Sequence, residues 1–278
     1  MCSLLALSAA IWCWPQPSPR VDGQQQSQLL SSETSEVNSV SQMITTDTSP
    51  SLALIPAYNE ARRITPVIQR ARTLLPVLVV DDGSKDDTAS VAETAGATVL
   101  RQIPNQGKGA ALRAGMRWAL DNGYETVLTL DADGQPDPSE IPAFLTRFAD
   151  THADLIIGAR TFGHMPAGRR IANTVGRWSF SWALGQAVQD NQSGYRLLSR
   201  RMIEAILDSQ EQGFEFEVEM IVTCVQQGYV LDWVPIRTIY GDQGSHIDPL
   251  HHAAQFSRIV IRTRRRMRDH EGAKAMKA

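Results

Sequence analysis

Two aspartates, Asp131 and Asp133, are the clearest candidates for chemistry in this sequence. They follow the apolar run Thr126–Leu130, which has the composition of a buried strand, and Gly134 ends any regular element. Side chains two positions apart on an extended segment point to the same face, so both carboxylates could reach one cation. Gln135 would add an oxygen at the next such position. Oxygen ligands suit Mg²⁺ or Mn²⁺. The alternative is an acidic turn that only ends the strand.

Apolar runs of strand length alternate with amphipathic runs of helical length around these aspartates. Predicted strands lie at 51–56, 77–80, 98–100 and 126–130, and predicted helices at 61–75, 88–95 and from 105–109 to 122. This order indicates βαβ units, so we expect an α/β fold with a mainly parallel central sheet flanked by helices. Open α/β folds bind ligands beyond the carboxyl ends of their strands, which is where the aspartates would lie.

The remaining sequence predicts further elements of both kinds. Helices are expected at 138–150, 171–188, 200–207 and 216–227, strands at 155–159, 195–198 and 230–236, and a loop at 160–170. The length fits one large domain or two small ones. We expect residues 51–248 to form one domain.

The first 50 residues differ in composition from the rest. Residues 4–14 form an apolar run of signal-peptide length, too short to span a membrane as a helix. Residues 16–50 are rich in Gln, Ser and Thr, which predicts disorder. Two explanations are open: an N-terminal signal or anchor, or a translation start assigned upstream of the true one. Met43, just before the first predicted strand, favours the second.

Composition excludes several classes of protein. A formal net charge of −3 gives no indication of nucleic-acid binding. Three scattered cysteines are too few for a disulfide framework or a zinc site, so we expect a reducing, cytoplasmic environment. No Gly-x-Gly-x-x-Gly follows the first predicted strand and there is no Gly-Lys-Ser/Thr P-loop, which argues against a dinucleotide enzyme or an ATPase. No stretch approaches the roughly 20 apolar residues of a membrane span, so we expect a soluble or peripheral protein.

Five stretches in order resemble the family-2 glycosyltransferases, in the branch of dolichyl-phosphate mannosyltransferase and bacterial polyprenyl-phosphate glycosyltransferases. They are PAYNE at 56–60, DDGSKDDT at 81–88, NQGKGAALRAGM at 105–116, DADGQ at 131–135 and DNQSGYRLLSR at 190–200. Each motif alone is weakly specific, whereas the ordered set is strong. The resemblance covers about Leu52 to His246. It implies a GT-A type fold with a Rossmann-like nucleotide-binding half.

The resemblance also implies which residues bind a nucleotide-diphosphate sugar. The residues expected at its base and ribose are Pro56, Ala57, Tyr58, Glu60, Asp82 and Ser84. Lys108 begins a predicted helix, where a cation and backbone N–H groups favour phosphate. Asp131, Asp133 and Gln135 would hold Mg²⁺ or Mn²⁺ against the diphosphate. A solvated capping run at 81–87 and a surface charge at Lys108 are the plainer alternatives.

The implied activity is transfer of a hexose, with inversion, from a donor of GDP-mannose or UDP-glucose type to a polyprenyl or dolichyl phosphate. A phosphate monoester is already largely dianionic at neutral pH, so this acceptor needs cations rather than a base. The residues expected at the acceptor phosphate are Arg160, Arg169, Arg170 and Ser193. The candidate catalytic residues are Asp133, Asp190 and Arg196. Toward a hydroxyl acceptor Asp190 would be the base. Toward a phosphate it would orient Arg196 or an acceptor-side group.

Residues 249–278 predict a basic amphipathic helix and tail. Apolar side chains recur at helical spacing from Phe256 to Met267, and arginines cover the other side. Such a helix is typical of membrane-surface elements, which would place the enzyme peripherally on the cytoplasmic membrane face. Packing of the apolar stripe on the domain is the alternative, and the two can coexist.

Rival functions are a soluble family-2 glycosyltransferase acting on a glycan or small-molecule hydroxyl with Asp190 as base, and a non-catalytic nucleotide-sugar-binding protein. The second would be expected to lack the metal carboxylates, and both are present. A nucleotidyltransferase would ordinarily have a Gly-rich, basic loop after the first strand, and PAYNE is not such a loop.

Overall fold

The computed structural model describes residues 50–135, 137–160, 167–211, 213, 215–237 and 249–275. At 167–173, 249–256, 271 and 273–275 only the backbone is described. The expectations for residues 1–49 lie outside these residues, as does part of the loop expected at 160–170.

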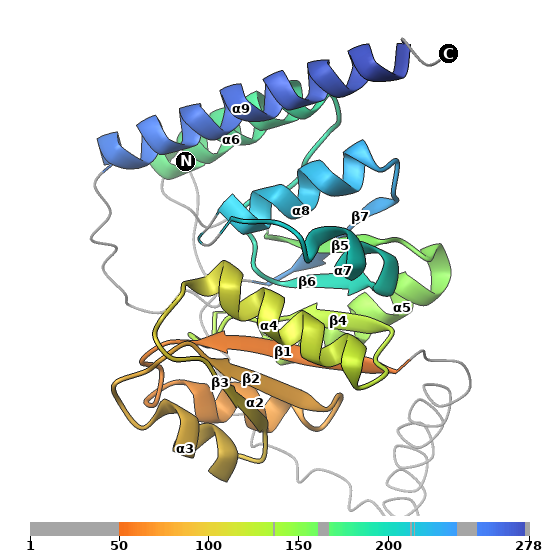
Figure 1. The fold of residues 1–278 in the computed structure, drawn as a ribbon. Coiled ribbons are helices and arrows are strands. Elements are labelled where there is room, and N and C mark those ends of the chain that lie inside the picture. Colours follow the sequence, from red (N-terminus) through yellow and green to blue (C-terminus); the bar gives the residue numbers. More distant parts are fainter. Residues whose placement is uncertain are drawn as a thin grey trace, which may run out of the picture. The chain divides into compact units, whose positions relative to one another are not determined.

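A seven-stranded sheet forms the centre of the described structure, in the order β3-β2-β1-β4-β6-β5-β7 (Figure 1). The strands are β1 (Ser51–Ala57), β2 (Val77–Asp81), β3 (Thr98–Arg101), β4 (Thr126–Thr129), β5 (Leu155–Arg160), β6 (Arg196–Ser199) and β7 (Leu231–Ile236). β1 pairs in parallel with β2 and β4, β2 with β3, and β5 with β7. β6 runs antiparallel to both β4 and β5. The expected α/β fold with a mainly parallel sheet is confirmed, with this one exception among the described strands.

Helices cover both faces of the sheet, because its central strands are apolar on both sides. On β1, Leu52 and Leu54 enter one core, whereas Ala53 and Ile55 enter the other. Successive side chains of a strand point to opposite faces, so two helical layers are needed to bury them. One layer contains α2 (Ile64–Ala71), α3 (Thr88–Thr94), the 3₁₀ turn η1 (Pro138–Glu140) and α5 (Ile141–Thr151). The other contains α4 (Lys108–Asp121), α6 (Ala167–Leu184), α7 (Arg200–Ile206), α8 (Glu215–Gln226) and α9 (Pro249–Ala275).

α4 lies very close to β1, which brings its first residue to the strand ends. A Cβ at Gly115 would lie 2.3 Å from the Cδ1 atom of Leu54, so a larger residue here would displace the buried Leu54 side chain. Gly107 caps α4 with φ of 91°, a conformation that L side chains rarely adopt. The helix therefore begins at Lys108, beside the carboxyl ends of β1 and β4.

Two predicted boundaries differ in ways that concern the site. β4 ends at Thr129, although the backbone N–H of Leu130 still donates to the carbonyl of Leu54 (3.0 Å). Asp131 and Asp133 therefore lie in the turn after β4 and not on an extended strand. The helix expected at 171–188 begins earlier, at Ala167, so that Arg169 and Arg170 lie in its first turn and not in a loop.

α9 packs on α6 and α8 and lies alongside α6 (Figure 1). Ile259, Thr263 and Met267 are buried. The apolar stripe of this helix therefore packs on the domain, which was one of the two possibilities considered from the sequence. Arg258, Arg262, Arg265 and Arg268 are exposed on its other side. Within the described ranges no helix combines the length and the apolar character that crossing a membrane requires.

Candidate active site

A cavity of about 420 Å³ opens at the carboxyl ends of β1, β2 and β4. The residues that line it are Pro56, Ala57, Tyr58, Glu60, Asp82, Asn105, Gly107, Lys108, Ala111, Asp131, Ala132 and Asp133. Most of the residues predicted to bind the donor are among them. They meet because β1, β2 and β4 run parallel, so that their carboxyl ends lie at one edge of the sheet.

Asp82 organises the loop that precedes α4. It is buried, and its two carboxylate oxygens accept hydrogen bonds from the backbone N–H groups of Gln106 (2.9 Å) and Gly107 (2.8 Å). Asn105 donates its side-chain amide to the carbonyl of Asp82 (2.9 Å). The DDGS and NQGKG motifs are thus one connected unit, which fixes the start of α4 and with it Lys108.

Lys108 joins two carboxylates from distant parts of the chain. Its Nζ atom donates to Oδ1 of Asp131 (2.5 Å) and to Oε1 of Glu217 on α8 (2.8 Å). Burial by itself would lower the pKa of this amine, but the two carboxylates outweigh it and raise the pKa of Lys108 above its ordinary value. Lys108 is therefore a fixed positive charge at the cavity.

Asp133 and Glu60 carry negative charge into the same cavity. Burial raises the pKa of Asp133, and the nearby charge of Asp131 adds to the rise. Burial likewise raises the pKa of Glu60, although Arg63 lies 2.7 Å from its carboxylate and opposes the shift. These carboxylates would be stabilised by further positive charge.

The DNQSGYR stretch reaches this cavity from the other half of the sheet. Thr129, the last residue of β4, donates its hydroxyl to the carbonyl of Gly194 (2.7 Å). A Cβ at Gly194 would lie 2.6 Å from Oδ2 of Asp131. Gly194 therefore lies directly against the Asp131 carboxylate, and a larger residue would push that carboxylate away.

Asp190 and Arg160 form a two-point ion pair on this second side of the site. The Nε atom of Arg160 donates to Oδ2 of Asp190 (2.7 Å), and its NH2 group donates to Oδ1 (3.0 Å). The backbone N–H of Gln192 also donates to Oδ1 (2.9 Å). Asp190 is buried and thus serves to orient the guanidinium at the end of β5.

Arg196 is fully buried and binds backbone carbonyls. Its guanidinium donates to the carbonyls of Ser193 (2.7 Å), Asn191 (3.3 Å) and Glu217. Burial lowers the pKa of Arg196, while the charges of Glu217 and Asp190 oppose the shift. These contacts tie the 191–194 turn to α8 and give Arg196 a positioning role.

Some of the predicted site residues do not line the cavity. Ser84 accepts a hydrogen bond from the backbone N–H of Asn59 (2.9 Å) and so joins the loops after β1 and β2. Gln135 is exposed, and its backbone N–H donates to Oδ1 of Asp133 (2.9 Å). Ser193 is buried in the turn held by Arg196. The side chains of Arg169 and Arg170 lie outside the described residues.

Comparison with protein families identifies the family to which the sequence motifs at this site belong. Residues 53–207 match the model described as glycosyl transferase family 2. The chain belongs to that family. This glycosyltransferase is 35% identical over 211 residues to an undecaprenyl-phosphate mannosyltransferase of Micrococcus luteus. The aligned region covers 69% of this chain and 85% of that protein. It is 31% identical over 207 residues to a polyprenol monophosphomannose synthase of Mycolicibacterium smegmatis, covering 68% and 77% of the two chains. The branch predicted from the motifs is confirmed.

Solved structures confirm the GT-A type fold of this glycosyltransferase. The glucosyl-3-phosphoglycerate synthase of Mycobacterium tuberculosis, crystallised with Mn²⁺, UDP and phosphoglyceric acid, matches with a TM-score of 0.60 over 77% of each chain. The two sequences are 22% identical, so the likeness concerns the fold.

The cavity of this glycosyltransferase fits a divalent cation that is shared with donor phosphates. Mg²⁺ is commonly held by one or two carboxylates together with waters and substrate phosphates. Asp131 and Asp133 offer such a pair, and burial with mutual repulsion leaves Asp133 in need of positive charge. Among the described residues no group of three or more His, Cys, Asp or Glu side chains could hold a metal ion.

The sequence did not lead us to predict the cavity-lining Asn105 and Gly107, or Glu217, which is a charged residue at the site. It is buried, and its neighbours Phe216, Val218 and Met220 on α8 are buried too. A carboxylate within an apolar helical run was the available signal, because such a group is rarely buried unless it is paired.

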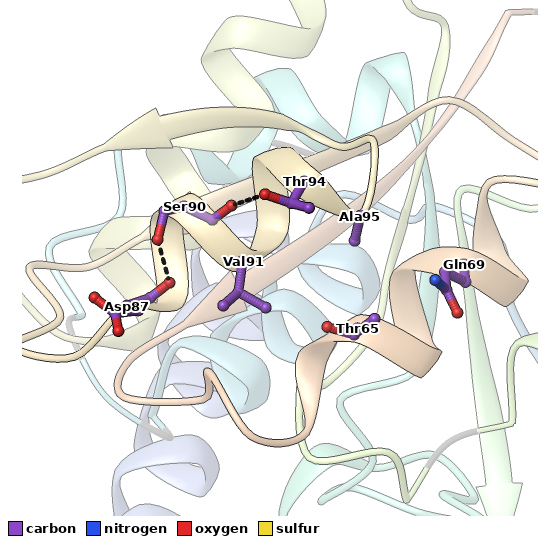
Figure 2. A pocket seen from close by; sticks show the side chains of 7 residues that line it. All are labelled: Thr65, Gln69, Asp87, Ser90, Val91, Thr94 and Ala95. Carbon is purple, nitrogen blue, oxygen red and sulfur yellow. Dashed lines mark hydrogen bonds between the residues drawn. The ribbon is translucent and has the colours of Figure 1, made fainter.

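A second hollow, of about 310 Å³, lies between α2 and α3 (Figure 2). Two of its hydroxyl groups form local hydrogen bonds: Ser90 donates to the carbonyl of Asp87 (3.0 Å) and Thr94 to that of Ser90 (2.8 Å). Asp87 is its one charged side chain. This hollow offers no cation for a phosphate, so we assign it no role in transfer.

Proposed function

We propose that this glycosyltransferase transfers a hexose from a nucleotide-diphosphate sugar to a polyprenyl phosphate at a membrane surface. The reaction would be a single displacement at the anomeric carbon, with inversion. The observation that carries the proposal is the two-point pair between Asp190 and Arg160, because it favours a phosphate acceptor over a hydroxyl acceptor. The names of the Micrococcus and Mycolicibacterium relatives support the same acceptor class.

The donor would bind in the 420 Å³ cavity, where its leaving diphosphate needs positive charge. Lys108 supplies a permanent ammonium at the start of α4, where the first backbone N–H groups of the helix also favour phosphate. A divalent metal ion held by Asp131 and Asp133 would supply Lewis-acid stabilisation of that leaving group. Asp82 keeps the Lys108 loop in place, and Tyr58 exposes its ring at the cavity for contact with the base.

The acceptor would bind on the side of β5 and β6. A general base must direct a lone pair toward the proton that it removes. Both carboxylate oxygens of Asp190 instead accept hydrogen bonds from Arg160. A phosphate monoester needs no base but does need an oriented cation, and Arg160 is such a group. Asp190 is therefore a positioning residue in this proposal, and Arg160 contacts the acceptor phosphate.

Transfer assays with a panel of radiolabelled GDP- and UDP-hexoses would test the proposal and identify the donor. The acceptor is a purified polyprenyl phosphate in detergent, with Mg²⁺ or Mn²⁺ added. We expect one donor to give chloroform-soluble label that requires the metal. Asp133→Asn should abolish the label, whereas Asp121→Asn, an exposed change at the end of α4, should retain it.

Two other outcomes would each correct a different part of the proposal. Metal-dependent hydrolysis of a nucleotide sugar without lipid labelling would keep the donor half and reject the acceptor. In that case transfer to hydroxyl acceptors, with Asp190→Asn as the inactive variant, would make Asp190 the base. Label that does not depend on metal or on Asp133 would reject the metal-bridged donor.

A further inference from the structure

α6 carries a stripe of large apolar side chains that face solvent. Trp178 is 72% exposed, and Trp182 and Val175 are each 57% exposed. They lie at positions i, i+3 and i+7 of the helix and therefore share one face. The opposite face of α6 is ordinary core, since Phe180 and Leu184 are buried. Exposed tryptophans are not needed to build this helix, so the stripe indicates a contact with something apolar.

A strongly basic helix borders this stripe. The guanidinium of Arg264 on α9 lies over the indole of Trp182, 5.2 Å from the ring centre. Ile261, one turn before Arg265, is 53% exposed on the same helix. Residues 249–278 contain eight Lys and Arg residues but only two Asp and Glu residues, although the whole chain has a formal net charge of −3. This segment thus has a net positive charge, in contrast to the whole chain, and Arg264 places it next to an exposed tryptophan of α6.

We propose that these residues form one surface that docks on an anionic lipid bilayer. We call it the α6–α9 face: Val175, Trp178 and Trp182 of α6, with Ile261, Arg264, Arg265 and Arg268 of α9. Tryptophan favours the boundary between headgroups and acyl chains, where its ring is buried and its N–H remains hydrated. Arginine places its stem along apolar surface and its charge among phosphates. The pairing of Trp182 with Arg264 combines the two in one contact.

The position of α6 connects this face to the reaction. β5 ends at Arg160, which is held by Asp190, and α6 begins at Ala167. Only six residues separate Arg160 from the start of the helix that bears the tryptophans, so this helix directly follows the acceptor side of the proposed site along the chain. A polyprenyl phosphate keeps its chain in the bilayer and presents its phosphate at the surface. Docking through α6 would bring the enzyme to the depth at which that phosphate lies. This step rests on the proposed function, whereas the docking itself does not.

Vesicle flotation of the full chain would test the docking directly. Vesicles of phosphatidylcholine with phosphatidylglycerol should bind the protein, and binding should weaken with salt and in phosphatidylcholine alone. Trp178→Ser with Trp182→Ser should lower the partition coefficient about tenfold or more. Leu74→Ser is the matched control, because Leu74 is an exposed apolar residue beside α2 in the opposite helical layer. Arg265→Glu should also lower binding about tenfold, whereas Arg117→Glu on α4 should not.

Transfer assays separate failure of docking from failure of the proposed function. We expect the double tryptophan variant to use a short-chain, water-soluble polyprenyl phosphate as well as wild type does, and to lose transfer to a long-chain acceptor in vesicles. Absence of transfer to both acceptors by wild type, with vesicle binding intact, would reject the proposed function but keep the docking surface.

Three results would overturn the docking proposal. Wild type that does not float with anionic vesicles would reject it, as would tryptophan variants that float like wild type. A wild-type dimer in light scattering that becomes a monomer in the double tryptophan variant would show that a second copy, and not lipid, covers the stripe.

Discussion

The ammonium of Lys108 lies 2.8 Å from the buried carboxylate of Glu217 and 2.5 Å from that of Asp131. The first contact comes from α8 and the second from the turn after β4, so one side chain of α4 connects these two elements at the cavity. Glu217 is 4% exposed, which makes Lys108 its charge partner and fixes where the lysine can point.

Replacing this pair should separate stability from activity. Lys108→Met removes the ammonium that donates to the buried carboxylate of Glu217, although the charge of Arg196 remains nearby, and should lower the free energy of unfolding by about 3 kcal/mol. Adding Glu217→Gln removes the stranded charge, so the double variant should recover most of that stability without recovering transfer. Urea denaturation and initial rates would measure the two effects. Glu204→Gln, an exposed change on α7, should alter neither. Recovery of activity in the double variant would mean that Lys108 only neutralises Glu217.

Asp190→Asn should raise the KM for the phosphate acceptor about tenfold or more, with a smaller effect on kcat, because it loosens Arg160 without removing it. Arg160→Lys should behave similarly, since an amine cannot make the two-point contact. Steady-state kinetics at varied acceptor concentration would measure this split. Loss of kcat with an unchanged acceptor KM, together with loss of the acid limb of the pH profile, would instead identify Asp190 as a base.

Gly194→Ala should impair transfer without unfolding the protein. The added Cβ would meet Oδ2 of Asp131 at 2.6 Å, and that flexible carboxylate can turn away. Because displacements of about 1 Å in a site can cost about 100-fold in rate, we expect a loss of that order. Thermal unfolding and transfer rates would be compared with Gly272→Ala, where a Cβ meets nothing within 4 Å. Wild-type rates in Gly194→Ala would show that the Asp131 position is not critical.

Asp154 should make stability depend on pH. It is buried, and burial alone would raise its pKa, but hydrogen bonds from Arg201, Val230 and Ser199 outweigh this and hold the pKa of Asp154 below its ordinary value of 3.8. A depressed acid pKa stabilises the fold above pH 3.8, and this contribution is lost as pH falls through the folded-state pKa. Asp154→Asn should therefore cost about 2 kcal/mol at pH 7 and less as pH falls below 3.8.

Urea denaturation across this pH range would measure the effect, with Asp208→Asn, an exposed change, as the control. A cost that does not vary with pH would mean that the contacts of Asp154 with Ser199 at the end of β6, with Arg201 of α7 and with Val230 before β7 do not depend on its charge.

The cavity proposed to bind the donor could be predicted from the sequence because local signals determine which residues line it. Apolar runs set β1, β2 and β4, and parallel pairing places the residues that follow them at one edge. Even here one prediction was wrong. The sequence indicated that Asp131 and Asp133 converge because they alternate on an extended strand, whereas both lie in a turn after Thr129. They still line one cavity because that turn, and not strand alternation, directs them there.

The acceptor half depends on long-range contacts that no local pattern reveals. Asp190 and Arg160 are 30 positions apart and meet because β5 and β6 are neighbours in the sheet. Three glutamates lie close together on α8, and only helix rotation decides that Glu217 enters the core while Glu219 pairs with Arg266. The exposed tryptophans of α6 resembled core residues in the sequence, because exposure is a property of tertiary packing.

The antiparallel direction of β6 has a consequence for how the two substrates are brought into register. Thr129 at the end of β4 pairs with Arg196 at the start of β6, so the segment that precedes β6 reaches the donor cavity. A parallel strand in that place would have offered Ser199 and Arg200 instead. A slip of one residue between β4 and β6 would turn every side chain of the slipped strand to the opposite face of the sheet. In the proposed reaction, the Thr129–Arg196 pairing would therefore set the distance between the leaving group at the cavity and the acceptor phosphate near Arg160.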